Sequence, residues 1–309
     1  MHELIVIGGG PAGLAAAAYA VRKRMDALFI SKGLGGRSRR RLRLPWIDDY
    51  QVIVGEETIQ RFRTQLDYLD FMRVRAAVTR LDVIDGGFRV EVAGDKTYDA
   101  LTVVLATGAY GASLNVPGEI EYEMQGLCYS AMTYAPLMVD RRVIVVGEEL
   151  LALRAVAELS RIVTEVTLIA EKDGDLDGST GRRVLAADNV AVIRHARVLE
   201  VTGDGTYARG VLVEREGRQE EIPADAIFVE KRLIPNSRLV DGLVQMDPCG
   251  FIEVDARNRT SLPGLFAAGD VTSSSAFQAL MGLGDGEKAA LSAFDYLLDL
   301  PLAVSACED

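Results

Sequence analysis

Short apolar runs and helix-forming segments alternate at the start of this chain. An apolar run at 4–7 leads into a glycine-rich turn at 8–13, then into an alanine-rich segment at 14–24, and a second apolar run follows at 27–30. A strand, a turn, a helix and a parallel strand at this spacing predict a βαβ unit.

The same order returns near the middle of the chain. An apolar run at 143–146 precedes Gly147, a helical segment at 150–160 and another apolar run at 166–169. We interpret this as an internal duplication of one βαβ unit in which the second copy is altered.

Alternating apolar and polar positions follow each unit, which is the period of a half-buried strand. They predict strands at 78–84, 88–92, 97–106, 190–195, 198–202, 210–214 and 226–229. A helix is predicted near 56–69 and a closing helix at 276–298.

Composition narrows the class of protein. The 309 residues are 49% hydrophobic and 26% charged, a balance typical of soluble globular domains, and the length favours two of them. The apolar runs are strand-sized, so we expect no membrane span. With no basic leader and only three widely spaced cysteines, the sequence predicts a reduced, cytoplasmic protein.

Charge argues against nucleic-acid binding, because the net charge is −11. It is unevenly placed, however. Five arginines fall within seven residues, at Arg37, Arg39, Arg40, Arg41 and Arg43.

The first glycine-rich turn carries the pattern G-x-G-x-x-G at Gly8, Gly10 and Gly13, with Pro11 and Ala12 between the last two. After a strand and before a helix, the first glycine permits a tight turn, the second lets a diphosphate approach, and the third allows close packing. The pattern predicts a dinucleotide site. The acid expected at the end of the second strand is missing, and Ser31 would have to offer a hydroxyl to the ribose instead.

Three further segments indicate which dinucleotide binds. Val104–Gly108 with Val116–Glu119 resembles the A-T-G and P-G-E elements of the two-dinucleotide-binding flavoproteins. Thr260–Val271 resembles their second FAD fingerprint, which implies that Asp270 holds a ribitol hydroxyl and that the following helix points its N-terminus at the flavin.

Taken together, the chain resembles the low-molecular-weight thioredoxin reductase family. The motifs that carry this resemblance, in order, are G-G-G-P-A-G at 8–13, Gly35-Gly36, Pro45-Trp46, Gly55-Glu56-Glu57 with Phe62, A-T-G at 106–108, A-A-G-D at 267–270, and Gln278 with Gly282, Gly284 and Gly286. It implies FAD, a homodimer and an α/β fold of two Rossmann-like (three-layer ββα) dinucleotide-binding domains. We expect an FAD-binding domain at 1–114 and 245–309, with a degenerate NAD(P)H-binding-like domain inserted at 115–244.

The resemblance also implies a set of FAD-binding residues. They are Gly8, Gly10, Pro11, Ala12, Gly13, Ser31, Gly35, Gly36, Arg37, Val78, Ala106, Thr107, Gly108, Gly269, Asp270, Gln278 and Ala279. A second flavin per chain stays open.

The family's redox disulfide is missing. Its two C-x-x-C positions fall on Ser130 and Thr133, and hydroxyls cannot carry out thiol–disulfide exchange. Cys128 lies two residues away and Cys307 lies in the tail, neither with a partner at this spacing. We interpret both as plain thiols, with Cys128 kept as a candidate redox residue.

The family's second glycine loop is also altered. It reads Gly147-Glu148-Glu149, which places two carboxylates where a diphosphate would bind. The basic cluster that recognises NADPH is replaced by Ala170-Glu171-Lys172-Asp173. We therefore expect no NADPH binding, although Glu171 could hold an NADH ribose.

The arginine run lies where the family has G-G-Q beside the flavin, with Arg37 at the glutamine position. It is either a solvated loop, a dock for an acidic electron carrier such as ferredoxin or flavodoxin, or a clamp for an anion. The family's ferredoxin-dependent and diflavin-linked branches likewise lack nicotinamide binding.

No other chemistry is indicated. His2 and His195 have no nucleophile in motif spacing, no paired Cys/His set predicts a metal site, and Asp173, Asp175 and Asp177 lack the glutamate of a calcium loop.

The leading hypothesis is an FAD-dependent oxidoreductase that exchanges electrons with a protein carrier or a small molecule. Its catalytic residues stay unassigned, Cys128 and Arg37 being the candidates. The alternatives are a catalytically silent flavin-binding redox sensor and a disulfide reductase that uses a non-standard cysteine.

Overall fold

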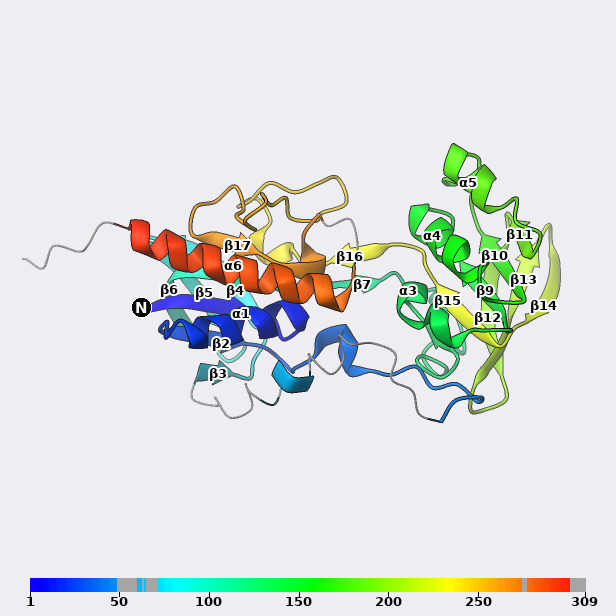
Figure 1. The fold of residues 1–309 in the computed structure, drawn as a ribbon, viewed down its shortest axis with the longest axis horizontal. Helices are drawn as coiled ribbons and strands as arrows, with labels where there is room; N and C mark the ends of the chain where they lie inside the picture. The colour runs from blue at the N-terminus through cyan, green and yellow to red at the C-terminus, as the bar shows by residue number, and fades with distance from the viewer. Residues whose placement is uncertain (49–59, 63, 65–71, 274–276, 301–309) are drawn as a thin grey trace, which may run out of the picture. The chain divides into compact units, whose positions relative to one another are not determined.

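The computed structural model describes residues 1–48, 60–62, 64, 72–273 and 277–300. By their internal contacts these belong to two compact units (Figure 1). Unit 1 combines Met1–Arg39, Gly55–Ala109 and Pro235–Asp309, and unit 2 combines Arg40–Val54 and Tyr110–Ile234. Most of the helix predicted near 56–69, the Gly55-Glu56-Glu57 motif and Cys307 lie outside the described residues.

Unit 1 is built on one sheet in the order β3-β2-β1-β6-β5-β4, with β17 also paired to β6. Its strands are β1 (His2–Ile7), β2 (Ala27–Ile30), β3 (Arg73–Val74), β4 (Val78–Ile84), β5 (Gly87–Val92), β6 (Lys96–Leu105) and β17 (Leu265–Ala267). β1 pairs in parallel with β2 and β6, whereas β4, β5 and β6 form an antiparallel meander. The order reverses at β1, which creates the switch point where α/β sheets bind ligands.

Two helices cover one face of this sheet and lie side by side, α1 (Pro11–Arg22) and α6 (Ala279–Asp299) (Figure 1). A Cβ on Gly286 would lie 2.0 Å from the carbonyl oxygen of Ala12, so this close helix contact requires glycine. α1 begins at Pro11, three residues before the predicted start, because proline fits the first helical position.

Unit 2 contains a parallel sheet in the order β11-β10-β9-β15-β8 and an antiparallel sheet β12-β13-β14. The strands are β8 (Leu127–Cys128), β9 (Arg142–Val146), β10 (Glu165–Ala170), β11 (Val190–Arg194), β12 (Arg197–Gly203), β13 (Ala208–Arg215), β14 (Arg218–Pro223) and β15 (Ala226–Val229). The helices are α3 (Ala131–Tyr134), α4 (Leu150–Leu159) and α5 (Ser179–Val184).

Alternate residues of β9 explain the three layers of unit 2. Val143 and Val145 pack in a buried cluster with the helices, while Ile144 and Val146 pack in another cluster with β12 and β13. The predicted α/β fold with two Rossmann-like ββα domains is confirmed.

Short elements complete the description. β7 (Ala109–Gly111) pairs with β16 (Leu233–Pro235), and 3-10 turns occupy Gly36–Arg39, Ala135–Leu137, Arg238–Val240 and Gly269–Val271. The two units differ from the expected domains in their bounds, since 40–54 and 110–114 belong to unit 2 and 235–244 belong to unit 1. Within the described part of the chain, no helix is long and apolar enough to cross a membrane.

Candidate functional site

The three glycines of the first turn have the three environments that a dinucleotide turn needs. Gly8 has φ +119°, and a Cβ there would lie 2.1 Å from the oxygen of Ala106. A Cβ on Gly13 would lie 1.8 Å from the oxygen of Gly8, so α1 packs directly against the turn. A Cβ on Gly10 would meet nothing within 4 Å, and this residue caps the N-terminus of α1. The turn is therefore closed by packing at two glycines and open at the third.

The segment after β2 closes over this turn. The Gly35 amide donates to the oxygen of Gly9 at 2.7 Å. A Cβ on Gly36, whose φ is +53°, would lie 2.9 Å from the Cα of Gly10. Beside it, the Ser31 hydroxyl is buried and finds no hydrogen-bond partner among the described residues. An unpartnered buried hydroxyl is costly without a ligand, and it lies where a ribose is expected.

The A-T-G turn after β6 is fixed by a residue that no motif indicates. The Thr107 hydroxyl donates to the carbonyl oxygen of Asn236 at 2.7 Å. In return the Asn236 side-chain amide donates to the oxygens of Thr107 at 3.0 Å and Gly108 at 3.2 Å. Asn236 lies 129 residues from Thr107, so only the fold reveals this partner.

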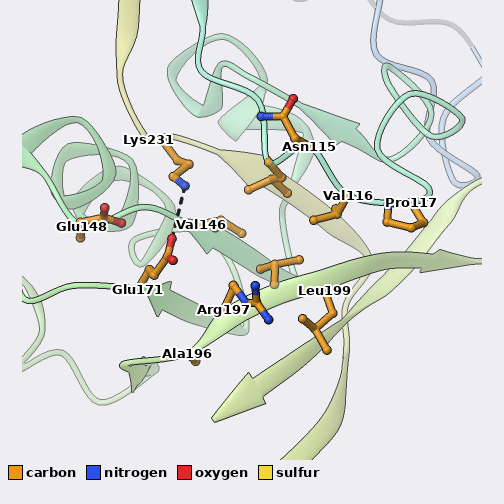
Figure 2. Close-up of a pocket in the computed structure, with 12 residues that line it drawn as sticks. Asn115, Val116, Pro117, Val146, Glu148, Glu171, Ala196, Arg197, Leu199 and Lys231 are labelled. Carbon is orange, nitrogen blue, oxygen red and sulfur yellow. Dashed lines mark ion pairs between the residues drawn. The ribbon is translucent and has the colours of Figure 1, made fainter.

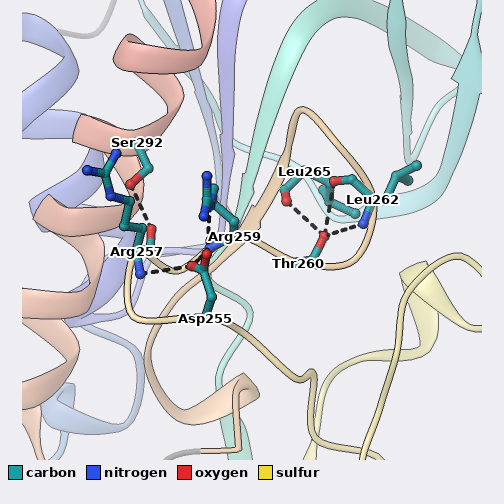
Figure 3. Close-up of polar contacts among 7 residues, drawn as sticks. All are labelled: Asp255, Arg257, Arg259, Thr260, Leu262, Leu265 and Ser292. Atoms are coloured by element: carbon teal, nitrogen blue, oxygen red, sulfur yellow. Dashed lines mark hydrogen bonds and ion pairs between the residues drawn. The ribbon is translucent and has the colours of Figure 1, made fainter.

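The loop before β17 is held by its own polar side chains (Figure 3). The Asp255 carboxylate accepts from the amides of Arg257 and Arg259 and from the Arg259 guanidinium, at 2.7–3.0 Å. Burial alone would raise the pKa of Asp255, but these hydrogen bonds outweigh it and lower the pKa.

Two further hydrogen bonds fix the ends of this loop (Figure 3). The Thr260 hydroxyl donates to the oxygen of Leu265 at 2.8 Å. Ser292, on α6, donates to the oxygen of Arg257 at 2.7 Å. The loop thereby fixes β17 and α6, the two elements that flank Gly269 and Asp270.

Asp270 faces a cation. The Arg37 guanidinium lies 3.6 Å from the Asp270 carboxylate. Burial raises the pKa of Asp270, the Arg37 charge opposes the rise, and Asp285 adds to it. The structure thus places together two residues that the sequence predicts beside one flavin.

The residues around the first glycine turn and Asp270, called the FAD cradle below, fit FAD. Gly10 leaves room for a diphosphate at a helix N-terminus, and the buried Ser31 hydroxyl is available to hydrogen-bond a ligand. Gln278 caps α6 and Ala279 begins it, while Gly269 packs against Ala12, where a Cβ would come within 2.9 Å. Val78 begins β4 and packs against the core behind the sheet, so its role in cofactor binding stays a prediction.

The corresponding loop of unit 2 keeps the packing glycine but not the open one. A Cβ on Gly147 would lie 2.3 Å from the oxygen of Glu230. Glu149 occupies the N-cap position of α4 without a capping hydrogen bond from its side chain, and Glu148 precedes it. Burial raises the pKa of Glu148, the Lys231 ammonium opposes this, and the carboxylates of Glu149 and Glu171 add to the rise. Two carboxyl groups therefore occupy the end of the helix that favours anions.

A pocket of about 310 Å³ lies beside this loop, at the carboxyl ends of the parallel strands (Figure 2). Its charged residues include Glu148, Glu171, Lys231 and Arg197. Lys231 pairs with Glu171 at 3.7 Å, and Arg197 pairs with Glu214 at 3.0 Å. Both cations that line the pocket therefore have carboxylate partners.

The positions of the family's disulfide carry a hydroxyl pair. The Ser130 and Thr133 oxygens lie 2.7 Å apart, and the buried Glu230 carboxylate accepts from the Ala131 amide at 2.5 Å. Cys128 is buried in β8, and this burial raises its pKa well above that of an ordinary thiol. A raised pKa disfavours the thiolate that redox chemistry requires.

The arginine run is partly anchored. Arg40 forms an ion pair with Glu123, and Leu42 and Leu44 are buried in the core of unit 2. Arg41 and Arg43 are exposed. In the segment from 41 to 44, exposed arginines thus alternate with buried leucines. This alternation is easily missed in the sequence because arginine is so frequent there.

The remaining polar candidates form surface ion pairs. Arg194 contacts Asp173 and Asp177, and His195 lies 3.4 Å from Asp173. Among the residues with described positions, no three His, Cys, Asp or Glu side chains form a group that could hold a metal ion.

Comparison with known proteins finds relatives that cover nearly the whole chain. Residues 2–286 match the family described as pyridine nucleotide-disulphide oxidoreductase. The chain is 36% identical to a subunit of the alkyl hydroperoxide reductase of Pseudomonas putida and 32% identical to NADH dehydrogenase of Bacillus subtilis, covering 96% of this chain in each case. It spans only 58% of the length of those two relatives.

Among solved structures, thioredoxin reductase from Streptococcus pyogenes is similar, with a TM-score of 0.86 and 28% identity. The match covers 97% of this chain and 99% of that one. The predicted resemblance to thioredoxin reductases is confirmed.

Proposed function

Because this chain belongs to the pyridine nucleotide-disulphide oxidoreductase family, we propose that it is an FAD-dependent oxidoreductase that takes its electrons from a source other than NADPH. The observation that carries this proposal is the pair of carboxyl groups, Glu148 and Glu149, at the N-terminus of α4. Two like charges 4 Å apart repel by about 4 kcal/mol at an effective dielectric constant near 20. A diphosphate at this loop would meet that repulsion, whether it belongs to NADPH or to NADH.

The FAD cradle of unit 1 supports the part of the proposal that concerns flavin binding. The open face of Gly10 and the N-terminus of α1 would bind the diphosphate, Ser31 would bind a ribose hydroxyl, and Asp270 would orient the ribitol chain. FAD supplies the two-electron chemistry when bound. Arg37 holds a positive charge beside Asp270 and thereby balances the half-buried carboxylate.

The hydroxyl pair of unit 2 supports an electron acceptor other than a disulfide within this chain. Ser130 and Thr133 hold the hydrogen-bonded turn where two thiols would be expected, and neither can be oxidised to a disulfide. Electrons would then leave the flavin directly, to a protein carrier or to a small molecule.

Binding of ADP-ribose tests the carboxylate argument without any redox step. We expect weak binding to the natural protein and at least tenfold tighter binding to the Glu148→Gly/Glu149→Gly variant, because removing about 1.4 kcal/mol of repulsion raises affinity tenfold. The Glu148→Gln/Glu149→Gln variant, which removes charge but not bulk, should fall between the two. Tight binding of ADP-ribose to the natural protein would refute the loss of the nucleotide site.

For the electron carrier we propose an acidic iron–sulfur protein or flavodoxin that docks on Arg41 and Arg43, whose side chains are exposed. Electrostatic steering raises association rates and is sensitive to salt. Reduction of the flavin by a reduced [2Fe–2S] ferredoxin should slow roughly tenfold in an Arg41→Gln/Arg43→Gln variant, measured by stopped flow at low salt. The control Arg218→Gln on β14 should keep the natural rate, and equal slowing in both variants would exclude this docking site.

We also propose a homodimer that uses α6. Leu280, Leu291 and Leu298 are 49%, 38% and 68% exposed, and their spacing of about three and two helical turns places them on one face. In a two-fold symmetric dimer the same face of α6 from both copies would meet, which would cover all three leucines. Leu291→Glu should yield monomers in sedimentation velocity, whereas Ile120→Glu, at a residue 89% exposed in unit 2, should leave the dimer intact. A natural protein that sediments as a monomer would end this proposal.

A further inference from the structure

The pocket of unit 2 has a polar end and an apolar end. Figure 2 shows Glu148, Glu171 and Lys231 at one side and Val116, Pro117 and Leu199 at the other. Val116 and Pro117 come from the loop that enters unit 2, and Leu199 comes from β12. Glu148, Glu171 and Lys231 follow β9, β10 and β15, while the fourth charged residue, Arg197, begins β12. A ligand that fills this pocket must therefore carry a hydrogen-bonding part and a flat or apolar part.

The place of this pocket in the sheet is one where α/β folds bind ligands. β10 lies on one side of β9 and β15 on the other, so the strand order reverses at β9. Val146, the last residue of β9, lines the pocket, together with Glu171 directly after β10 and Lys231 two residues after β15. Crevices at the carboxyl ends of strands, at such a switch point, are preferred binding sites.

At the polar end of the pocket, the Glu171 carboxylate can accept hydrogen bonds from two neighbouring hydroxyls of a ligand. Glu171 is half-exposed, and its ion pair with Lys231, at 3.7 Å, is longer than a hydrogen bond. Both carboxylate oxygens of Glu171 can therefore still accept hydrogen bonds. A carboxylate with two free oxygens binds a cis-diol bidentately.

The same end of the pocket disfavours phosphate. Glu148 lines it directly, and the two cations, Lys231 and Arg197, are already paired with Glu171 and Glu214. The Asp175 amide donates to the oxygen of Glu148 at 2.9 Å, and a Cβ on Gly174 would lie 2.2 Å from that oxygen, so the loop after β10 packs closely on the Glu148 backbone. The volume of about 310 Å³ lies at the low end for small-molecule pockets.

We propose that this pocket binds a nucleoside without phosphates, its base against Val116, Pro117 and Leu199 and its ribose diol on Glu171. The inference rests on the proposed loss of the dinucleotide site, since it assigns that same site a smaller ligand. Such a ligand carries no electrons to the flavin, so its binding makes unit 2 a sensing module rather than a donor site.

Isothermal titration of the FAD-loaded protein with adenosine, 2′-deoxyadenosine and ADP-ribose tests the proposal. We expect adenosine to bind, 2′-deoxyadenosine to bind at least tenfold more weakly, and ADP-ribose to bind more weakly than adenosine. Glu171→Gln should abolish the preference for the diol. The control Glu165→Gln, at the exposed opposite end of β10, should keep it.

The outcomes separate this inference from the proposed function. If none of the three ligands binds, or if adenosine and 2′-deoxyadenosine bind equally, the nucleoside site is refuted and the lost dinucleotide site stands. If ADP-ribose binds more tightly than adenosine, both proposals are refuted, because the loop at Glu148 then accepts a diphosphate.

Discussion

A Gly10→Glu variant should fold normally and lose FAD. A Cβ at this position meets nothing within 4 Å, and the φ of −75° at Gly10 is one that any residue adopts, so the added side chain begins in open space. It would place a carboxylate at the N-terminus of α1, where we propose that the diphosphate binds. At an effective dielectric constant near 20 the repulsion is about 4 kcal/mol, which corresponds to a loss of affinity of about 100- to 1,000-fold.

Titration of the flavin-free protein with FAD, followed by flavin fluorescence, measures this loss. Gly10→Ala is the matched control, because it adds a small uncharged group to the same open space and should bind FAD within a few-fold of the natural protein. Unchanged FAD affinity in Gly10→Glu would mean that the diphosphate does not lie at this helix end.

The second large effect is expected on stability. Glu119 is buried, and its carboxylate accepts hydrogen bonds from the amides of Leu114 and Asn115 at 2.6 and 2.7 Å and from the Tyr129 hydroxyl at 2.6 Å. Glu119→Leu would leave three donors without this acceptor. Each unsatisfied buried donor costs about 1–3 kcal/mol, so we expect the free energy of unfolding to fall by roughly 3 kcal/mol or more.

Urea unfolding, followed by circular dichroism, measures the change. Glu121→Leu, two residues away and exposed, should change the free energy of unfolding by no more than about 0.5 kcal/mol. A Glu119→Leu protein as stable as this control would show that the P-G-E element does not hold the loop at 114–117, which forms one wall of the pocket.

The sequence predicts the elements with clear periodicity well. β4 and β15 begin and end at the predicted residues, because their alternating or wholly apolar runs stop at turn residues. The sequence does not predict β14. Five of its six residues are exposed, and its polar run R-Q-E-E shows no alternation of apolar and polar residues. Its strand conformation comes from pairing with β13.

The candidate site likewise contains residues that the sequence predicts and residues that it does not. Gly8, Gly10, Gly13 and Ser31 follow from local spacing, since the glycine turn and the end of β2 are adjacent in any βαβ unit. Asn236, which fixes the A-T-G turn, could not be predicted, because its contacts join residues more than 100 positions apart and no motif marks it.

In the arginine run, the high arginine content makes the two buried leucines hard to recognise from the sequence. Arg40, Arg41 and Arg43 dominate the sequence of this segment, and they suggest a solvated loop. The buried side chains of Leu42 and Leu44 decide the conformation of the segment, since each is packed into the core of unit 2.

Reduction of the bound flavin by nucleotides tests whether this protein lacks a nicotinamide donor site. The FAD-loaded protein is titrated under argon with NADPH, then NADH, and the flavin absorbance near 450 nm is followed, with dithionite as the control reductant. We expect stoichiometric nucleotide to leave the flavin oxidised and dithionite to bleach it. Bleaching by one equivalent of NADPH or NADH would show that Glu148 and Glu149 do not exclude a nicotinamide donor.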